Sequence, residues 1–249
     1  MKTCVVVDLG TIAYGEAATL QQWLVAARKA NAIPDLLLFC EHPHVITLGR
    51  NGKRQNLLAS EDLLRQKGVE FHHSNRGGDI TYHGAGQIIG YPILDLNGIR
   101  RDVVWYVRQL EECMIGATST FGIQAFRVPG RTGVWVQSLQ NNCDDQAPIS
   151  AKLASIGVHI SRWVTSHGFA YNVCTDLSFF DLITPCGIAN CRVTSLKKLL
   201  GISVSREDVV ARLKAAFAET FALELVLGHR VDLDVWSAHE SLSVHLPAR

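Results

Sequence analysis

Cys186 is the residue whose setting in the sequence points most directly to chemistry. It lies between Pro185 and Gly187, in a turn that presents a side chain without a neighbouring Cβ in the way. A thiol has a pKa of about 8.5, so a nearby basic group raises the fraction of reactive thiolate at neutral pH. The remaining cysteines form no CxxC pair, which disfavours a zinc site or a redox dithiol. Cys186 is therefore a candidate nucleophile, most of the others are interpreted as small buried side chains, and Cys191 is interpreted as structural.

Lys152 and His167 are candidates for the basic group. Lys152 begins an otherwise apolar stretch, where a lysine usually marks a strand edge with its ammonium in water. A lysine held in an apolar site can instead have its pKa lowered and shuttle protons. His167 precedes Gly168, and a single histidine is as often a structural hydrogen-bonding group as a catalyst. The residues alone leave both questions open.

A glycine-rich segment at 76–92, RGGDITYHGAGQIIGYP, is the second feature with chemical potential. Glycine lets the backbone approach a ligand closely, and bare N–H groups in such a loop bind phosphate, carboxylate or carbonyl oxygens. The spacing matches neither the P-loop nor the GxGxxG pattern. A tight hairpin that needs glycine for its geometry is the alternative. Polar side chains recur between the glycines, so we favour a binding role.

The elements that must position these residues can be read from hydrophobic periodicity and capping signals. Helices are expected at 14–30, from Ser60 to Gly68, from Asp102 to about Thr120, and after a capping box at Ser205 and Asp208. Strands are expected at 1–10, at 36–40 and 45–48 around a turn at His42-Pro43, at 133–137, at 152–160 and at 169–173. Residues 138–150 are expected to form an exposed loop. Because helices and strands do not alternate regularly, the pattern predicts mixed α/β layers in one domain, 1–249.

The composition of the chain limits the classes of function that it can have. The 249 residues are 47% hydrophobic and 19% charged, which suits a chain with a sizeable core. The net charge of +1 gives no field for nucleic acid or a membrane surface. No apolar run approaches the roughly 20 residues of a spanning helix, and the N-terminal strand is too short for a signal peptide. We therefore expect a cytoplasmic protein that binds neither nucleic acid nor membrane.

Taken together, the motifs resemble those of the lipoyl(octanoyl) transferases, the octanoyltransferases of lipoate biosynthesis. That family's pattern is RGGxxTYHGPGQ, K-[IL]-A-x-[IL]-G, SHGxAxN, and PCG followed by VTSL. This chain has RGGDITYHGAGQ, KLASIG, SHGFAYN, and PCGI followed by RVTSL. EHPHVITLGR at 41–50 and TGVWV at 132–136 extend the match, which covers about 8–220. Each motif alone is weak, but the ordered set is highly specific.

The resemblance implies roles for individual residues. Cys186 would be the acyl-thioester nucleophile, and Lys152 the general acid/base that activates it. The acyl pocket would be formed by parts of three motifs: Arg76, Gly77, Gly78, Asp79, Ile80, Thr81, Tyr82, His83, Ser155, Ile156, Gly157, Gly168, Phe169 and Ala170. Oxyanion donors are expected among the backbone N–H groups near Gly77-Gly78 or at Cys186. The implied fold is the single mixed α/β domain of lipoate and biotin protein ligases.

The resemblance also implies the substrates. The octanoyl donor would be acyl carrier protein. The acceptors would be lysines of lipoyl domains, on the E2 subunits of 2-oxoacid dehydrogenases and on the glycine cleavage H protein. Neither ATP nor a metal would be needed, and we expect a monomer. Alternatives are an ATP-dependent lipoate or biotin ligase, a cysteine thioesterase or hydrolase that uses His83 or His167, and a binding module for carrier proteins without catalysis.

Three parts of the chain depart from the family pattern. Ala85 stands where the family has proline in HGPG, which is expected to loosen that turn. The loop at 138–150 is longer than the usual short hairpin. Residues from about 222 to 249 form a C-terminal extension of unclear role.

Overall fold

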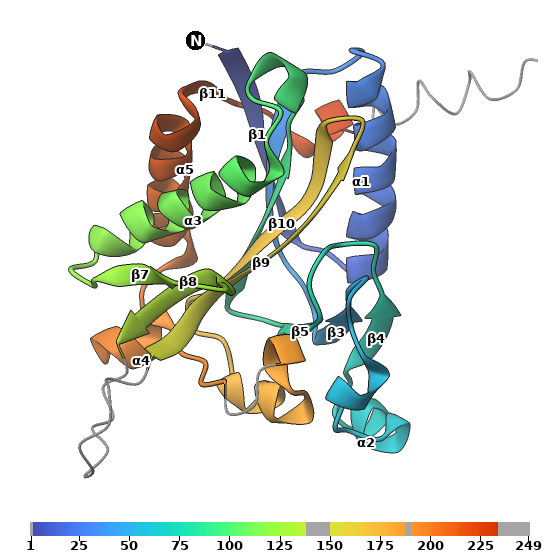
Figure 1. Cartoon of the computed structure of the whole chain (residues 1–249), viewed down its shortest axis with the longest axis vertical. Helices are drawn as coiled ribbons and strands as arrows, with labels where there is room; N and C mark the ends of the chain where they lie inside the picture. Colours follow the sequence, from blue (N-terminus) through green and yellow to red (C-terminus); the bar gives the residue numbers. More distant parts are fainter. Residues whose placement is uncertain (1, 138–149, 188–190, 234–249) are drawn as a thin grey trace, which may run out of the picture.

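The computed structural model describes residues 2–137, 150–187 and 191–233, and the loop expected at 138–150 lies almost entirely outside them. Its large sheet contains strands β1 (Lys2–Thr11), β2 (Asp35–Glu41), β6 (Gln87–Ile93), β7 (Ala125–Val128), β8 (Arg131–Gln137), β9 (Ser150–Ser161), β10 (Val164–Asn172) and β11 (Leu223–Leu227). The strand order is β11-β1-β2-β6-β10-β9-β8-β7 (Figure 1). β1 is parallel to both of its neighbours and the other pairs are antiparallel, so the sheet is mixed, as predicted.

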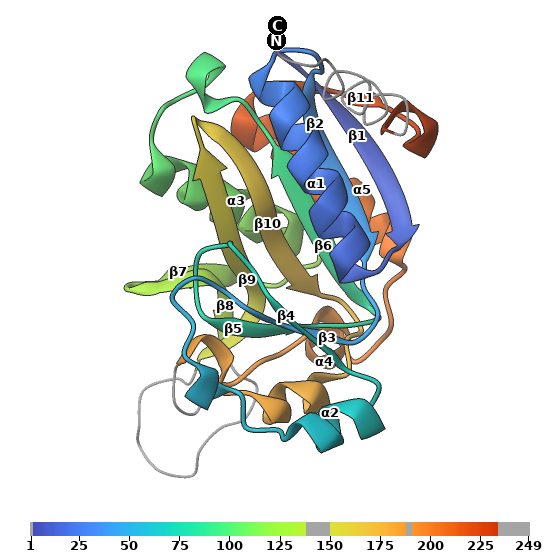
Figure 2. The ribbon, with the colours of Figure 1, turned by 90° about the vertical axis from the view of Figure 1, so that its right-hand side faces the viewer.

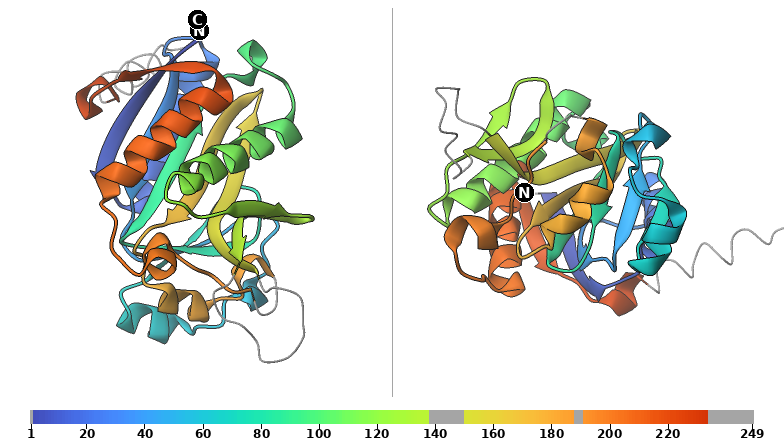
Figure 3. Two further views of the ribbon diagram at one scale, coloured as in Figure 1. Left: turned by 90° about the vertical axis from the view of Figure 1, so that its left-hand side faces the viewer. Right: turned by 90° about the horizontal axis from the view of Figure 1, so that it is seen from below.

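Helices cover both faces of this sheet. One face carries α1 (Tyr14–Lys29), which lies along the strands in Figure 2. The opposite face carries α3 (Val103–Ser119) and α5 (Arg206–Phe221), seen side by side in the left view of Figure 3. The run LLLFC of β2 is buried on both sides because its side chains alternate between the two layers. Leu36 and Leu38 pack towards α1, whereas Leu37 and Phe39 pack towards α3 and α5.

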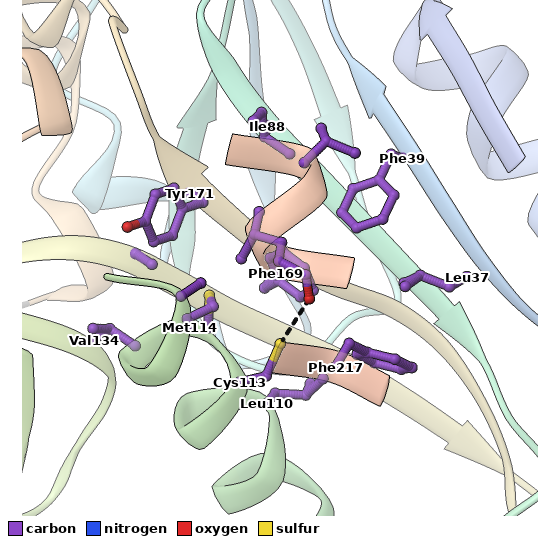
Figure 4. Packing of buried hydrophobic residues seen from close by; sticks show 14 of the residues in the cluster. Leu37, Phe39, Ile88, Leu110, Cys113, Met114, Val134, Phe169, Tyr171 and Phe217 are labelled. Carbon is purple, nitrogen blue, oxygen red and sulfur yellow. Dashed lines mark hydrogen bonds between the residues drawn. The ribbon is translucent and has the colours of Figure 1, made fainter. Parts of the chain in front are cut away.

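The core between α3, α5 and the sheet is closely packed. Phe217 of α5 is fully buried and lies against Leu110 and Cys113 of α3 (Figure 4). The Cys113 thiol lies 3.5 Å from the carbonyl oxygen of Leu213, and burial raises its pKa. This thiol is therefore a core side chain, as the sequence predicted for most of the cysteines.

A second, smaller sheet crosses the end of the large one (Figure 2). It consists of β3 (Val45–Leu48), β4 (Glu70–His73) and β5 (Ile80–His83) in the order β4-β3-β5. The strands expected on either side of His42-Pro43 exist, but they belong to different sheets. β5 and β6 also lie in different sheets, so the glycine-rich segment is not a simple hairpin. It connects the two sheets instead.

Short helices complete the fold. They are α2 (Glu61–Gln66), α4 (Leu196–Leu200) and the 3-10 turns η1 (Arg54–Asn56), η2 (Leu96–Gly98), η3 (Leu177–Leu182) and η4 (Pro185–Gly187). The predicted caps are present: Ser60, Asp102 and Ser205 each accept a hydrogen bond from a backbone N–H of the first helical turn. None of the helices in the described ranges combines the length and hydropathy that crossing a bilayer requires.

The C-terminal boundary of the sequence prediction needs correction. Residues 223–227 form β11, which pairs in parallel with the first half of β1 and forms one edge of the large sheet. This part of the expected extension therefore belongs to the core fold. The sequence offered no family motif here, and a short edge strand has little periodicity by which it could be recognised.

Candidate active site

Cys186 is held in a strained turn at the junction of the two sheets. Its backbone is left-handed, with φ 57° and ψ 18°, and Gly187 follows with φ 64°. A side chain at Gly187 would place its Cβ 2.6 Å from Oδ2 of Asp79, so any other residue would have to displace that carboxylate. The turn is anchored to η1 by the N–H of Thr184, which donates to the carbonyl of Asn56 at 2.7 Å. The Pro-Cys-Gly sequence thus presents one thiol at a defined place.

Lys152 reaches this thiol from β9. Its Nζ lies 3.2 Å from Sγ of Cys186 and donates to the carbonyl oxygen of Thr132 at 3.0 Å. The lysine is only 3% exposed and lies on an interior strand. It is therefore a buried lysine and not one at a strand edge with its side chain in water. Its Nζ also lies 4.9 Å from the ring centroid of Trp135, where the face of the indole would stabilise a cation formed on Lys152.

A β-bulge directs Lys152 towards the thiol. Val134 pairs with Ala154, whereas the next residue, Trp135, pairs with Lys152, so the register between β8 and β9 shifts at this point. Bulges re-aim side chains and are frequent next to active sites. The backbone of Lys152 is also bonded on the other side, to the segment that follows the Cys186 turn: its N–H donates to Arg192 and its carbonyl accepts from Thr194.

A cavity of about 260 Å³ opens beside the Cys186–Lys152 pair. Its apolar wall consists of Ile80, Ile89, Ile156, Phe169 and Ala170. Of the residues predicted to form an acyl pocket, those that line it are Arg76, Gly78, Asp79, Ile80, Thr81, His83, Ser155, Ile156, Gly157, Gly168, Phe169 and Ala170. Ligand pockets for drug-sized molecules measure about 300–1,000 Å³, so this cavity suits a small, largely apolar group.

Two of the predicted pocket residues lie elsewhere. Tyr82 points away from the cavity, where its hydroxyl bonds Nδ1 of His44 at 2.7 Å and its ring stacks on Phe179. The N–H of Gly77 donates to the carbonyl of Val158 at 2.8 Å, which makes it unsuitable as an oxyanion donor. The neighbouring β5 residues Ile80, Thr81 and His83 do line the cavity.

Buried polar side chains form the far wall of the cavity. Arg76 is 7% exposed and donates to the carbonyl and the hydroxyl of Thr47 at 2.7 and 2.9 Å. Burial lowers the pKa of its guanidinium. Burial also lowers the pKa of His83 to about 3 and that of His167 to about 4. Both histidines are consequently neutral at physiological pH.

The histidines have partners other than the thiol. Nδ1 of His83 bonds Oε1 of Gln87 at 2.8 Å, and Nε2 of His167 bonds Oδ1 of Asn75. The thiol's neighbour is Lys152, so the structure favours a Cys–Lys pair over a Cys–His pair. Cys191 lies close enough to interact electrostatically with both members of that pair, but burial raises its pKa. This agrees with its interpretation as a structural residue.

Sequence reasoning missed six residues that line the cavity: Tyr14, Ile89, Tyr91, Gly130, Arg131 and Thr132. TGVWV at 132–136 was part of the resemblance, yet no signal identified its first residue as the acceptor for Lys152. At Ala85, which departs from the family pattern, the side chain is exposed and the turn is held by its neighbour. The N–H of Gly86 donates to Oε2 of Glu41 at 2.7 Å. Among the described residues, no cluster of histidine, cysteine or acidic side chains is arranged to hold a metal.

Comparison with known proteins defines the class. A family described as the lipoyl protein ligase A/B catalytic domain matches residues 13–218. Among solved structures, a bipartite lipoate protein ligase from Thermoplasma acidophilum superposes with a TM-score of 0.74 at 16% identity, covering 98% of this chain and 93% of that one. A lipoate-protein ligase A bound with ATP superposes with a TM-score of 0.69 at 16% identity, covering 98% and 95%. The chain therefore contains a lipoyl protein ligase A/B catalytic domain and has the fold of lipoate protein ligases.

Relatives at higher identity narrow the class to one family. An octanoyltransferase from Solibacter usitatus is 49% identical over 228 residues, covering 92% of this chain and 97% of the relative. Another from Acidobacterium capsulatum is 47% identical, covering 90% and 89%. The chain belongs to the octanoyltransferase family, and the resemblance drawn from its motifs is confirmed.

Proposed function

We propose that the protein transfers an octanoyl group from acyl carrier protein to the ε-amine of a lysine on a lipoyl domain, through a thioester on Cys186. The observation that carries the proposal is the 3.2 Å contact between Nζ of Lys152 and Sγ of Cys186, at the mouth of an apolar cavity. A nucleophile within hydrogen-bond reach of a base is the arrangement that covalent catalysis requires.

In the first half-reaction Lys152 takes the thiol proton while Sγ of Cys186 attacks the thioester carbonyl. The resulting oxyanion needs backbone donors, and Gly78 and Cys186 both line the cavity where it would form. Collapse of the tetrahedral intermediate breaks the bond to the pantetheine sulfur. Lys152 then gives the proton that it took from Cys186 to this sulfur. The octanoyl group is then a thioester on Cys186, and Lys152 is neutral again.

In the second half-reaction the acceptor lysine attacks that thioester. Lys152 removes a proton from the attacking amine and returns one to Sγ as the thiol leaves. The amide product carries the octanoyl group, and the enzyme regains its starting protonation. Because both half-reactions use one site in turn, the kinetics are expected to be ping-pong.

The octanoyl group is already activated as a thioester on acyl carrier protein, so the proposed reaction requires neither ATP nor a metal. The cavity contributes chain selection: about 0.8 kcal/mol for each buried CH₂ amounts to roughly 5 kcal/mol for an octanoyl chain. The Thermoplasma ligase is described as part of a lipoylation system with an E2 lipoyl domain, which supports lipoyl domains as acceptors for this fold. Acceptors on E2 subunits and the H protein, a cytoplasmic location and a monomeric state are further parts of this proposal.

Intact mass spectrometry tests the nucleophile. Incubation with octanoyl-acyl carrier protein should add one octanoyl group to the wild-type protein and none to Cys186→Ala, whereas Cys191→Ala should still be acylated. An adduct that persists in Cys186→Ala would show that the nucleophile is another residue. Lys152→Ala should slow both half-reactions and move the alkylation of Cys186 to higher pH.

A transfer assay distinguishes the alternatives. Acylation of an isolated lipoyl domain should proceed at an unchanged rate after ATP is removed. A strict requirement for ATP would favour the ligase alternative, and release of octanoate without transfer would favour a hydrolase.

A further inference from the structure

Glu111 is a buried acid that the mechanism above does not use. It lies on α3, outside the cavity, and is only 3% exposed. Its Oε1 accepts a hydrogen bond of 3.0 Å from the backbone N–H of Gly133. A buried carboxylate is costly unless it is paired, so its position calls for a physical account.

The peptide group that Glu111 contacts is the one that contacts the catalytic pair. The N–H of Gly133 and the carbonyl of Thr132 are the two ends of a single peptide unit. The carbonyl end accepts the hydrogen bond from Nζ of Lys152 at 3.0 Å, and Nζ lies 3.2 Å from Sγ of Cys186. The Glu111 carboxylate, the Thr132–Gly133 peptide, the Lys152 amine and the Cys186 thiol thus form one continuous series of hydrogen bonds from helix α3 to the cavity.

Hydrogen bonds in such a series polarise one another. A peptide whose N–H donates to a carboxylate has a more negative carbonyl oxygen, which is a better acceptor for a charged ammonium. This series of hydrogen bonds therefore stabilises the state in which Lys152 has taken the thiol proton. That state is the one in which Cys186 is a thiolate.

The backbone at Gly133 makes the arrangement possible. Its φ of 123° is one that other residues rarely adopt. An added Cβ would lie 2.5 Å from the carbonyl oxygen of Ala154 and 3.4 Å from Nζ of Lys152. Glycine lets the peptide lie between Glu111 and Lys152 without obstruction.

We propose that Glu111 is a positioning residue for the reaction, acting on Lys152 through the Thr132–Gly133 peptide and favouring the ammonium–thiolate form of the pair. The proposal rests on the roles assigned to Cys186 and Lys152 under the proposed function. The second carboxylate oxygen pairs with Arg127 at 3.0 Å and lies 3.4 Å from Arg108. These arginines pair with the carboxylate and aim its other oxygen at Gly133.

Glu111→Gln tests the proposal, because it removes the charge and keeps the shape. We expect the loss of this one charge to raise the midpoint pH of Cys186 alkylation by about one unit. A shift of that size corresponds to about a tenfold loss of thiolate at neutral pH. The kcat for octanoyl transfer should fall by a similar factor while KM for the donor stays unchanged. Glu112→Gln is the matched control. Glu112 pairs with the same Arg127 at 2.6 Å but has 54% of its side chain exposed, and this variant should keep the wild-type profile.

A double mutant separates the failure of this inference from the failure of the proposed function. In a Lys152→Ala background, Glu111→Gln should cause no further change in the alkylation profile, because its effect passes through Lys152. If Lys152→Ala itself leaves the profile unchanged, the proposed function is wrong. If Lys152→Ala shifts the profile and a folded Glu111→Gln does not, the role of Glu111 alone is overturned.

A measurement on the wild-type protein covers the case in which Glu111→Gln does not fold. The amide resonance of Gly133, assigned by NMR, should titrate with the same midpoint as Cys186 alkylation. An amide signal that stays constant through that midpoint would show that the Thr132–Gly133 peptide does not couple Glu111 to the Lys152–Cys186 pair.

Discussion

The buried histidines of the cavity wall predict that the protein loses stability in mild acid. His83 and His167 are 8% and 7% exposed, and their pKa values in the folded protein are lowered to about 3 and about 4. In the unfolded chain both return to about 6.5. Between about pH 6.5 and about pH 4 the unfolded chain therefore binds two protons that the folded protein does not. Stability must fall as the pH falls through that window, because it rises with pH wherever the unfolded state binds more protons.

The size of the effect follows from the pKa differences. Each histidine contributes about 1.4 kcal/mol per pH unit below 6.5, so lowering the pH from about 7.5 to about 5 costs about 2 kcal/mol per group. The two together cost about 4 kcal/mol, a large part of the 5–15 kcal/mol stability that is typical of folded proteins. His42, whose pKa burial also lowers, acts in the same direction.

Urea unfolding at a series of pH values measures this dependence. His83→Gln removes one titrating group, so the free energy of unfolding should depend less on pH by about 2 kcal/mol over the same interval. Phe217→Ala is the control, because it weakens the core without removing a titrating group and should leave the slope unchanged. A wild-type slope near zero between about pH 6.5 and about pH 5 would refute the reasoning.

Other parts of the fold give further predictions. Gly168→Ala should destabilise the protein by about 1–3 kcal/mol in urea unfolding, because the added Cβ would lie 2.1 Å from the carbonyl of Gly90 on the next strand. Ala170→Val should shift the preference from octanoyl towards hexanoyl donors by about 15-fold in kcat/KM, since two added methyl groups displace about two methylenes worth ~0.8 kcal/mol each. An unchanged chain-length profile would show that Ala170 does not limit the cavity. Phe217→Ala should cost about 3–5 kcal/mol in urea unfolding while Cys186 still accepts an octanoyl group, because the fully buried ring belongs to the core and does not line the cavity.

The sequence predicted those features that depend on local chemistry. The caps at Ser60, Asp102 and Ser205 were correct because a hydroxyl or carboxylate before an amphipathic run satisfies the free N–H groups of a helix. The mixed α/β class followed from the irregular order of periodic segments. Family resemblance placed Cys186 and Lys152 as a pair, and the structure brings their side chains together.

Features that depend on distant pairing were not predictable. Nothing in the local sequence shows that β2 and β3, on either side of His42-Pro43, belong to different sheets. Sheet membership depends on which strands from later in the sequence pair with each of them. Thr132 and Glu111 carry no local signal either. Their importance comes from a bulge and from the packing of α3, both of which are tertiary features.

The left-handed backbone at Cys186 implies a compromise between stability and activity. A residue with a Cβ in this conformation costs about 1–2 kcal/mol, whereas glycine adopts it freely. At this position glycine would therefore suit the folded backbone better than the residue that nature uses. The protein tolerates that cost because the same conformation places the sulfur beside Lys152, and selection for greater thermal stability alone would tend to remove the nucleophile.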